Sequence, residues 1–393
     1  MGPRDRTGDA VDLNSFRGLA STILLGVIGP EVFIVQPGFV QGLVQHVGFD
    51  EQGAGYTASV EMFGIAATTV ALTFLARRLD WRKILTISLL LMFAANAACA
   101  YVDDLQTFAI LRVLAGFGAG GLISLSFTAI GLTRNPDRNF GWLIMWVLIY
   151  GALGLLAMPS AFNLIGMRGV LWFFALFPLI GLAVVRYMPR SGETVIHVSA
   201  DAVELSAALK SSALLSMFVY FLAQGVVWAY LFLIGVNGGL NEQQVANGLT
   251  ISQFAGVAGA FAAVLLAQRT HYAIALTVGI VGGAIVLYPL VGHFGAVLYA
   301  LTVSVYNFAW NYVQPVILGA MAKFDRRGHV VVYAVAAQMC GLAAGPGLAA
   351  LVIGDRSLTS VISLGIGLFF LSLALILPPV LAQAQRRQGV AVT

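Results

Sequence analysis

Charged residues are scarce in this chain of 393 residues, where Asp, Glu, Lys and Arg together make up 10% and apolar residues 59%. A soluble globular protein has roughly a quarter of its residues charged. So few charges cannot cover a water-facing surface for a chain of this length. The composition therefore excludes a soluble enzyme, a nucleic-acid-binding protein and a disordered protein, and leaves a membrane protein with several spans.

Cysteine is almost absent as well, since Cys99 and Cys340 are the only two. Both lie in apolar runs far apart in the chain, so we expect neither a disulfide framework nor a metal cluster. The polar segments contain no catalytic triad, no phosphate-binding loop and no metal-ligand spacing. We therefore expect no enzymatic activity, no cofactor and no ATP-driven pump.

Long apolar runs fill most of the sequence. A membrane helix needs about 20 mostly apolar residues, and twelve runs of this kind lie between polar breaks. They cover residues 17–45, 55–76, 82–101, 106–131, 141–164, 169–188, 211–236, 244–267, 272–291, 295–320, 330–353 and 358–381. We predict an all-α membrane protein with twelve transmembrane helices, the first of which is a retained span and not a signal peptide.

The basic residues indicate an orientation. With the N-terminus in the cytoplasm, eighteen of the 21 Lys and Arg residues face the cytoplasm, and only Arg112, Arg168 and Arg356 do not. This asymmetry is what the positive-inside rule predicts, and the even number of spans places both termini on the cytoplasmic side. The excess of arginine over lysine favours a GC-rich bacterial genome. We therefore expect a multi-pass protein of the bacterial inner (plasma) membrane.

The longest polar break lies at the midpoint of the chain. A shift of 191 residues aligns Gly48-Phe-Asp-Glu-Gln with Gly239-Leu-Asn-Glu-Gln and gives nine identities in 31 pairs, which indicates a repeat. We predict two pseudo-symmetric six-helix bundles, related as parallel repeats. The predicted parts are a cytoplasmic tail (1–16), an N-terminal bundle (17–188), a cytoplasmic linker (189–210), a C-terminal bundle (211–381) and a second cytoplasmic tail (382–393).

This organisation resembles the major facilitator superfamily. The family's loop after the second helix reads roughly G-x-x-x-D-R-x-G-R-K, whereas Thr73 to Lys83 reads T-F-L-A-R-R-L-D-W-R-K. The resemblance implies a gating loop made of Arg78, Asp80, Arg82 and Lys83. Because the family's acidic position is occupied by an arginine here, membrane anchoring by positive charge is the alternative.

Two further motifs can be compared with the family. The fourth span carries Arg112, Gly116 and Gly118 in the family's R-x-x-x-G-x-G pattern, and the resemblance links such an embedded arginine to proton coupling. The antiporter signature G-x-x-x-G-P is missing from the fifth span, because Gly154 stands apart from Pro159. This absence disfavours an antiporter.

Three charged residues, Glu31, Glu61 and Arg112, lie well inside the predicted spans. Charges at such depth are costly and mark functional sites. At about 1.5 Å per residue, all three fall at one depth on three helices of the first half. Two acids that share one arginine suit proton coupling, because protonation of one acid would release its hold on the arginine. The alternatives are a structural ion pair, or a Glu61 that faces water in the outer loop.

Amide and aromatic side chains follow one face of the tenth span. Asn307, Asn311 and Gln314 recur at i, i+4 and i+7, with Tyr306 and Trp310 beside them. The resemblance implies that the first, fourth, seventh and tenth helices line a central cavity, so we predict a substrate site on this face. The other predicted members of this site are Gln36, Gln224, Trp228, Gln253 and Gln338. Interhelical hydrogen bonding is the alternative role.

These features predict a proton-coupled secondary active transporter that works by alternating access. Its solute would be a small organic molecule, anionic or aromatic and amphipathic, because Arg112 leaves room for a carboxylate and the tenth span offers rings. We favour uptake by symport over efflux of drugs or metabolites by antiport. A non-transporting receptor or scaffold is less favoured, since it has no need of buried titratable groups. We expect a monomer whose partners are the solute, protons and the lipid bilayer, with no nucleic acid and no metal.

Overall fold

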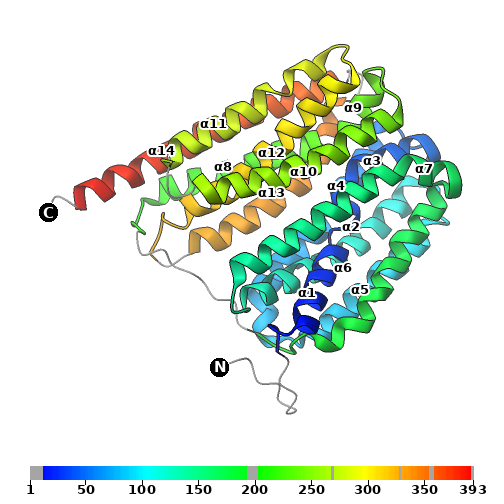
Figure 1. Cartoon of the computed structure of the whole chain (residues 1–393), viewed down its shortest axis with the longest axis horizontal. Helices are drawn as coiled ribbons and strands as arrows, with labels where there is room; N and C mark the ends of the chain where they lie inside the picture. Colours follow the sequence, from blue (N-terminus) through cyan, green and yellow to red (C-terminus); the bar gives the residue numbers. More distant parts are fainter. Residues whose placement is uncertain (1–11, 193–201, 267–269, 327–328, 354–357, 391–393) are drawn as a thin grey trace. The chain divides into compact units, whose positions relative to one another are not determined.

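The computed structural model describes residues 12–192, 202–266, 270–326, 329–353 and 358–390 (Figure 1). Most of the predicted N-terminal tail, the middle of the predicted linker, the last three residues and Arg356 lie outside the described residues. The chain divides into two compact units, residues 1–195 and 196–393. This division falls within the predicted linker, and the predicted bundle boundaries stay predictions.

The first unit is built from helices. Their bounds are α1 (Phe16–Ile28), α2 (Glu31–Ile34), α3 (Gln36–Gly42), the π-helix η1 (Leu43–Val47), α4 (Glu51–Leu75), η2 (Ala76–Arg78), α5 (Trp81–Cys99), α6 (Leu105–Gly131), α7 (Pro136–Val184) and η3 (Val185–Tyr187). Aspartates between the long helices stabilise their first turns, since a carboxylate satisfies N–H groups that have no helical partner. Asp50 accepts from Gly53 N at 2.7 Å, and Asp104 accepts from Thr107 N at 2.8 Å. The hydrogen bonds to the backbone and side chain of Thr107 lower the pKa of Asp104.

The first predicted span is not one continuous helix. The chain leaves the helical conformation at Pro30 (φ −85°, ψ 21°) and again at Val35 (φ −102°, ψ 15°). Proline has no N–H to continue the helical ladder, and Pro30 and Pro37 both fall in this stretch. The predicted span over residues 17–45 is therefore broken into three short α-helices and a π-helix.

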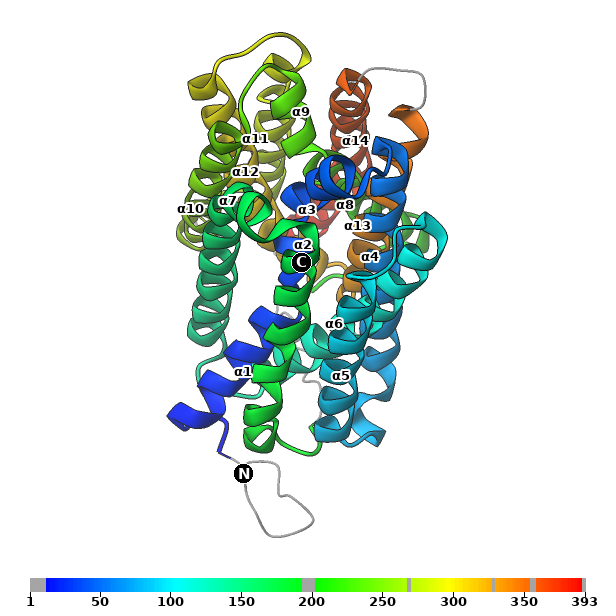
Figure 2. The ribbon, with the colours of Figure 1, turned by 90° about the vertical axis from the view of Figure 1, so that its right-hand side faces the viewer.

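The fifth and sixth predicted spans correspond to the two parts of α7. The helical conformation is interrupted at Gly166, where φ is 65° and ψ is 179°. Only glycine adopts this conformation readily, because it has no Cβ. Figure 2 shows the ribbon turning back near the label of α7, so that the two parts of this helix run in opposite directions.

The second unit repeats the helical construction. Its helices are α8 (Ala207–Trp228), α9 (Leu231–Asn237), α10 (Glu242–Leu266), α11 (Tyr272–Ile285), η4 (Tyr288–Val291), α12 (Ala296–Met321), α13 (His329–Ile353) and α14 (Thr359–Val390). Throughout the described part of the chain, every regular element is helical. The prediction of an all-helical fold is thereby confirmed for these residues.

The count of twelve spans is not confirmed. Among the described residues, nine helices are long and apolar enough to cross a membrane. The other three predicted spans correspond to the broken α1–α3 stretch, to the second part of α7 and to α12. Helix α12 has 26 residues but is not among the nine, because Asn307, Asn311 and Gln314 lower its hydropathy.

Glycines bring pairs of helices close together and so position the polar residues. In the first unit, a Cβ on Gly116 or Gly120 of α6 would overlap the main chain of α4 at Glu61 and Ile65. In the second unit, a Cβ on Gly259 of α10 would overlap the main chain of α12 at Phe308. Small residues permit such close approach in membrane helices. The most extensive helix–helix contact within each unit joins α4 to α6 and α10 to α12.

Candidate functional site

Arg112 on α6 is fully buried and pairs with Glu61 on α4. Its Nη2 donates to Glu61 Oε1 at 2.5 Å and its Nε donates to Glu61 Oε2 at 3.2 Å. The planar guanidinium thus holds both carboxylate oxygens, which is the strongest geometry for such a pair. The ring of Phe39 lies 5.3 Å from the guanidinium carbon and covers it. Glu61 is 4% exposed, so it does not face outer water.

Asn96 on α5 connects this pair to Glu31. It accepts from Arg112 Nη1 at 2.5 Å, and its Nδ2 donates to Glu31 Oε1 at 3.2 Å and to the main-chain oxygen of Phe174 at 2.9 Å. Asn96 is not among the residues predicted from the sequence. The signal was present, because Asn96 lies five residues before the end of its apolar run and hence about 8 Å deep, at the level of the three charges.

Glu31 begins α2, directly after the break at Gly29 and Pro30. It is 1% exposed, and its Oε2 atom is buried with no hydrogen-bond partner. Within the described residues, Glu31 makes neither a hydrogen bond nor an ion pair with Arg112. The three predicted charges do lie together with Asn96 in one cluster, hereafter the charge cluster. The two acids do not share the arginine as we expected, because the amide of Asn96 stands between Arg112 and Glu31.

In the second unit, rings from three helices form an aromatic cluster. Its members are Tyr220 and Trp228 of α8, Tyr306 and Trp310 of α12, and Phe369 of α14. Trp228 and Trp310 meet edge to face with centroids 5.8 Å apart. Gln224 lies beside them, because its Nε2 donates to Tyr220 Oη at 3.0 Å and its main-chain oxygen accepts from Tyr306 Oη at 3.4 Å. The side-chain oxygen of Gln224 is buried without a partner.

Two of the predicted amides point toward α10 and not toward this aromatic cluster. Asn307 Nδ2 donates to Ser252 Oγ of α10 at 3.3 Å, and Asn311 Nδ2 donates to Asn307 Oδ1 at 2.9 Å. A Cβ on Gly256 would press against both asparagines. The bond of Asn307 to Ser252 matches the alternative role of interhelical hydrogen bonding, whereas the bonds of Asn311 stay within α12. Substrate binding by these two residues stays a prediction.

The remaining predicted substrate residues are dispersed. Gln36 is buried at the start of α3, and Gln253 and Gln338 are buried on α10 and α13. Gln314 is half-buried on α12. The Nε2 atom of Gln253 is buried without a hydrogen-bond partner.

In the predicted gating loop, Asp80 and Arg82 make hydrogen bonds to main-chain atoms of the first unit. Asp80 accepts from the main-chain N–H groups of Arg82 and Lys83 and so begins α5. Arg82 Nε donates to the main-chain oxygen of Met188 at 2.7 Å, which ties α5 to the end of η3. Arg78 and Lys83 are exposed. These contacts stabilise the loop, and a gating role stays a prediction.

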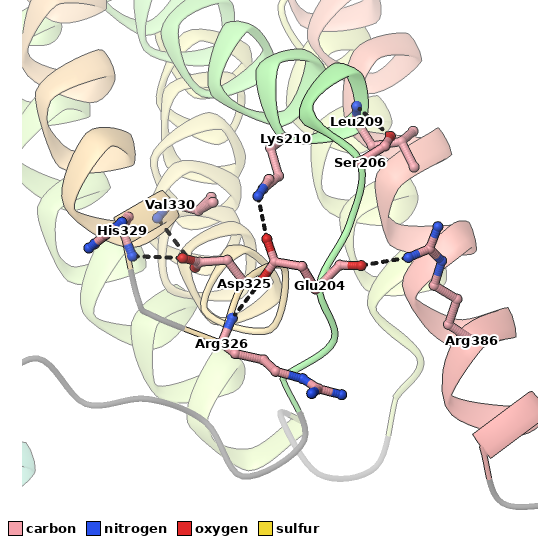
Figure 3. A network of polar contacts seen from close by, with 9 residues as sticks. All are labelled: Glu204, Ser206, Leu209, Lys210, Asp325, Arg326, His329, Val330 and Arg386. Atoms are coloured by element: carbon pink, nitrogen blue, oxygen red, sulfur yellow. Dashed lines mark hydrogen bonds and ion pairs between the residues drawn. The ribbon is translucent and has the colours of Figure 1, made fainter.

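A second polar network joins the residues that precede α8 to the ends of other helices in the second unit (Figure 3). Glu204 pairs with Lys210 Nζ at 2.6 Å, its Oε2 accepts from Arg326 N at 3.2 Å, and its main-chain oxygen accepts from Arg386 at 2.5 Å. Asp325 accepts from the N–H groups of His329 and Val330 at the start of α13. A cavity of about 760 Å³ lies among these residues. From the sequence, these residues were predicted to be linker and loop, with no site among them.

Comparison with known proteins identifies the family to which this chain is similar. The model described as Major Facilitator Superfamily matches residues 22–346. A protein of Bacillus subtilis (strain 168), provisionally named niacin/nicotinamide transporter NiaP, is 30% identical over 102 residues. This match covers 26% of the chain and 25% of the relative, so it spans about a quarter of that protein's length.

Solved structures match nearly the whole chain. A D-xylose–proton symporter has a TM-score of 0.73 at 17% identity, with 94% of this chain and 96% of that chain covered. A variant of the nucleoside transporter NupG has a TM-score of 0.71 at 15% identity, with 91% and 98% covered. At such identities the similarity establishes the fold.

Proposed function

This chain belongs to the major facilitator superfamily, and we propose that it is a proton-coupled secondary active transporter of a small organic solute. Membership of the family makes it a membrane transporter and not an enzyme. The observation that carries the proposal of proton coupling is the charge cluster. Four buried polar side chains there include one carboxyl group, Glu31, that is not paired with a cation.

The charge balance of the cluster supports Glu31 as the group that binds and releases the proton. Arg112 and Glu61 neutralise each other through two hydrogen bonds. A buried carboxylate without a counter-charge is unfavourable, whereas the protonated form is tolerated. Glu31 can therefore alternate between a neutral, protonated form and a charged form. The charged form requires the surrounding side chains to rearrange, because it has no counter-charge in the present arrangement. Such a coupling of protonation to conformation is what a proton-driven transporter needs.

The aromatic cluster supports a solute with an aromatic or amphipathic part. Its rings offer edge-to-face and stacking contacts, and the unpartnered oxygen of Gln224 offers a hydrogen-bond acceptor. An anionic group on the solute would have to displace Glu61 from Arg112. An aromatic part of the solute therefore has stronger support than an anionic group. Nicotinamide and niacin are small aromatic molecules of this kind, and one relative carries their name.

Uptake by symport is the proposed direction, because the fifth span lacks the antiporter signature. Both directions can be compared in one experiment. Purified protein in proteoliposomes would first be screened for thermal stabilisation by nicotinamide, niacin, uridine and D-xylose, since a ligand stabilises the state it binds. The stabilising compound would then be offered in labelled form with an inward or an outward proton gradient. Accumulation with an inward gradient supports symport, and accumulation with an outward gradient supports antiport.

The coupling residue is tested in the same vesicles. Glu31→Gln should abolish gradient-driven accumulation while exchange of labelled for unlabelled solute persists, because Gln cannot bind or release the proton. Asp103→Asn, at an exposed acid in the α5–α6 loop, is the matched control and should behave as the wild type. Unchanged gradient-driven accumulation in Glu31→Gln would refute the proposed coupling.

A further inference from the structure

The amide group of Asn96 has only one orientation that satisfies its neighbours. Its Oδ1 faces Arg112, and a guanidinium only donates hydrogen bonds. Its Nδ2 faces the main-chain oxygen of Phe174, which only accepts. The second N–H of Nδ2 therefore points at Oε1 of Glu31. Asn96 thus uses both of its donors, and Oε1 of Glu31 is an acceptor in this contact.

The surroundings of the second carboxyl oxygen of Glu31, Oε2, indicate whether this group is protonated. Oε2 is buried and has no hydrogen-bond partner. An ionised Glu31 would add a second negative charge to a cluster whose only cation, Arg112, is already paired with Glu61. Such an uncompensated buried charge is unfavourable. Glu31 is therefore neutral in this arrangement, and its hydrogen lies on Oε2, because Oε1 already receives the N–H of Asn96.

The titratable groups around Glu31 come from four helices. Arg112 lies on α6, Glu61 on α4 and Tyr150 on α7. The thiol of Cys99 on α5 faces Arg112. Arg112 is the cation among these groups. If Glu31 loses its proton, Arg112 is therefore the group with which its carboxylate can form an ion pair.

We propose that Asn96 is a positioning residue that assigns the proton of Glu31 to Oε2 and separates the Glu31 carboxyl group from Arg112. This inference rests on the proposed proton coupling and specifies how the same cluster controls it. When the O–H bond at Oε2 breaks, the proton passes to water and the carboxylate becomes charged. It then reaches Arg112 only if Asn96 or Glu61 is displaced. Proton release is thereby coupled to movement among α2, α4, α5 and α6.

Infrared difference spectroscopy tests this inference without a solute, because the proton itself is the probe. The full chain in lipid nanodiscs should show a C=O stretching band of a protonated carboxyl group that Glu31→Gln removes. In Asn96→Leu, the C=O group at Oε1 loses its donor, so the band should move to higher frequency. In Asn96→Ala, the vacated space lets Arg112 approach Glu31, so the band should disappear as Glu31 ionises.

Asn139→Leu is the matched control, since Asn139 is another buried asparagine of the first unit, hydrogen-bonded to Thr133 on the loop before α7. It should leave the band unmoved. A purely structural role of Asn96 would lower the melting temperature of both Asn96 variants and leave the band in place, which would overturn the inference. Absence of a Glu31 band in the wild-type protein would also overturn it, and this measurement requires no Asn96 variant.

The two proposals fail separately. Unchanged gradient-driven transport in Glu31→Gln refutes the proposed function. Loss of that transport in Glu31→Gln, together with an unmoved band in both Asn96 variants, leaves the proposed function standing and refutes the role of Asn96.

Discussion

Arg112 and Glu61 face each other through two hydrogen bonds of 2.5 and 3.2 Å, from α6 to α4, and both side chains are buried. The pair is possible because Gly116 lets α6 approach the main chain of α4 at Glu61 itself. The ion pair therefore depends on the close packing of these two helices.

Arg112→Ala should destabilise the first unit by about 3 to 5 kcal/mol, because it leaves Glu61 buried without a counter-charge. Arg112→Lys should also lower stability, since a single ammonium group cannot hold both oxygens of Glu61 and the oxygen of Asn96. Thermal unfolding of the purified protein in detergent measures both effects. Arg138→Ala, at an exposed position, is the control. A wild-type melting temperature for Arg112→Ala would contradict the prediction.

Glu61→Gln and Glu31→Gln should differ strongly in stability although the chemical change is the same. Glu61→Gln removes the only counter-charge of Arg112 and should cost several kcal/mol. Glu31→Gln retains an oxygen that accepts from Asn96, so its cost should stay within about 1 kcal/mol. The two melting temperatures, measured side by side, check this. Equal losses would mean that Glu31 carries the counter-charge as much as Glu61 does.

Asn307→Leu should lower stability by about 1 kcal/mol, the usual size of a hydrogen bond between membrane helices. It removes the bond to Ser252 and places a larger apolar group against Gly256. Solute affinity should change little, because Asn307 faces α10. Affinity and melting temperature should be measured together. A weaker affinity at an unchanged melting temperature would return Asn307 to the substrate site.

Trp310→Ala and Trp228→Ala should weaken binding of an aromatic solute about tenfold, which is about 1.4 kcal/mol. The rings of these residues meet edge to face, and such contacts contribute beyond buried area. Titration of the compound that stabilises the protein would give the affinities. Trp146→Ala removes an exposed tryptophan of α7 and should have no effect. Equal affinities in all three variants would exclude the aromatic cluster as the solute site.

Asp325→Ala should cost about 1 to 2 kcal/mol, because a buried carboxylate then no longer caps the first N–H groups of α13. Glu204→Gln should cost less than about 1 kcal/mol, since its pair with Lys210 is partly exposed to solvent. High salt should remove most of the Glu204 effect, because salt screens exposed charges. Melting temperatures at low and high salt check both expectations. A larger loss for Glu204→Gln than for Asp325→Ala would contradict them.

The sequence by itself determined the class of the protein and the depth of its buried charges. Hydropathy is a property of local runs, so the all-helical membrane class follows from composition and run length. The motif around Arg112 and the repeat indicated the family, and the family match confirms it. The rise per residue along a helix gave the shared depth of Glu31, Glu61 and Arg112, which lie in one cluster in the structure.

Only the tertiary structure decided which of these groups contact one another. Depth does not specify the rotation of a helix about its axis, and from the sequence Glu61 was the less favoured partner of Arg112. The packing of α4 on α6 nevertheless selects Glu61. Asn96 was one polar residue in an apolar run. Its contacts with Arg112, Glu31 and Phe174 require α6, α2 and α7 to be placed around α5, four helices in all. The packing of neighbouring helices also decides that the amides of α12 and its aromatic rings contact different helices. Spacing along one helix shows that side chains share a side, but the neighbouring helices α8 and α10 decide what each side chain touches.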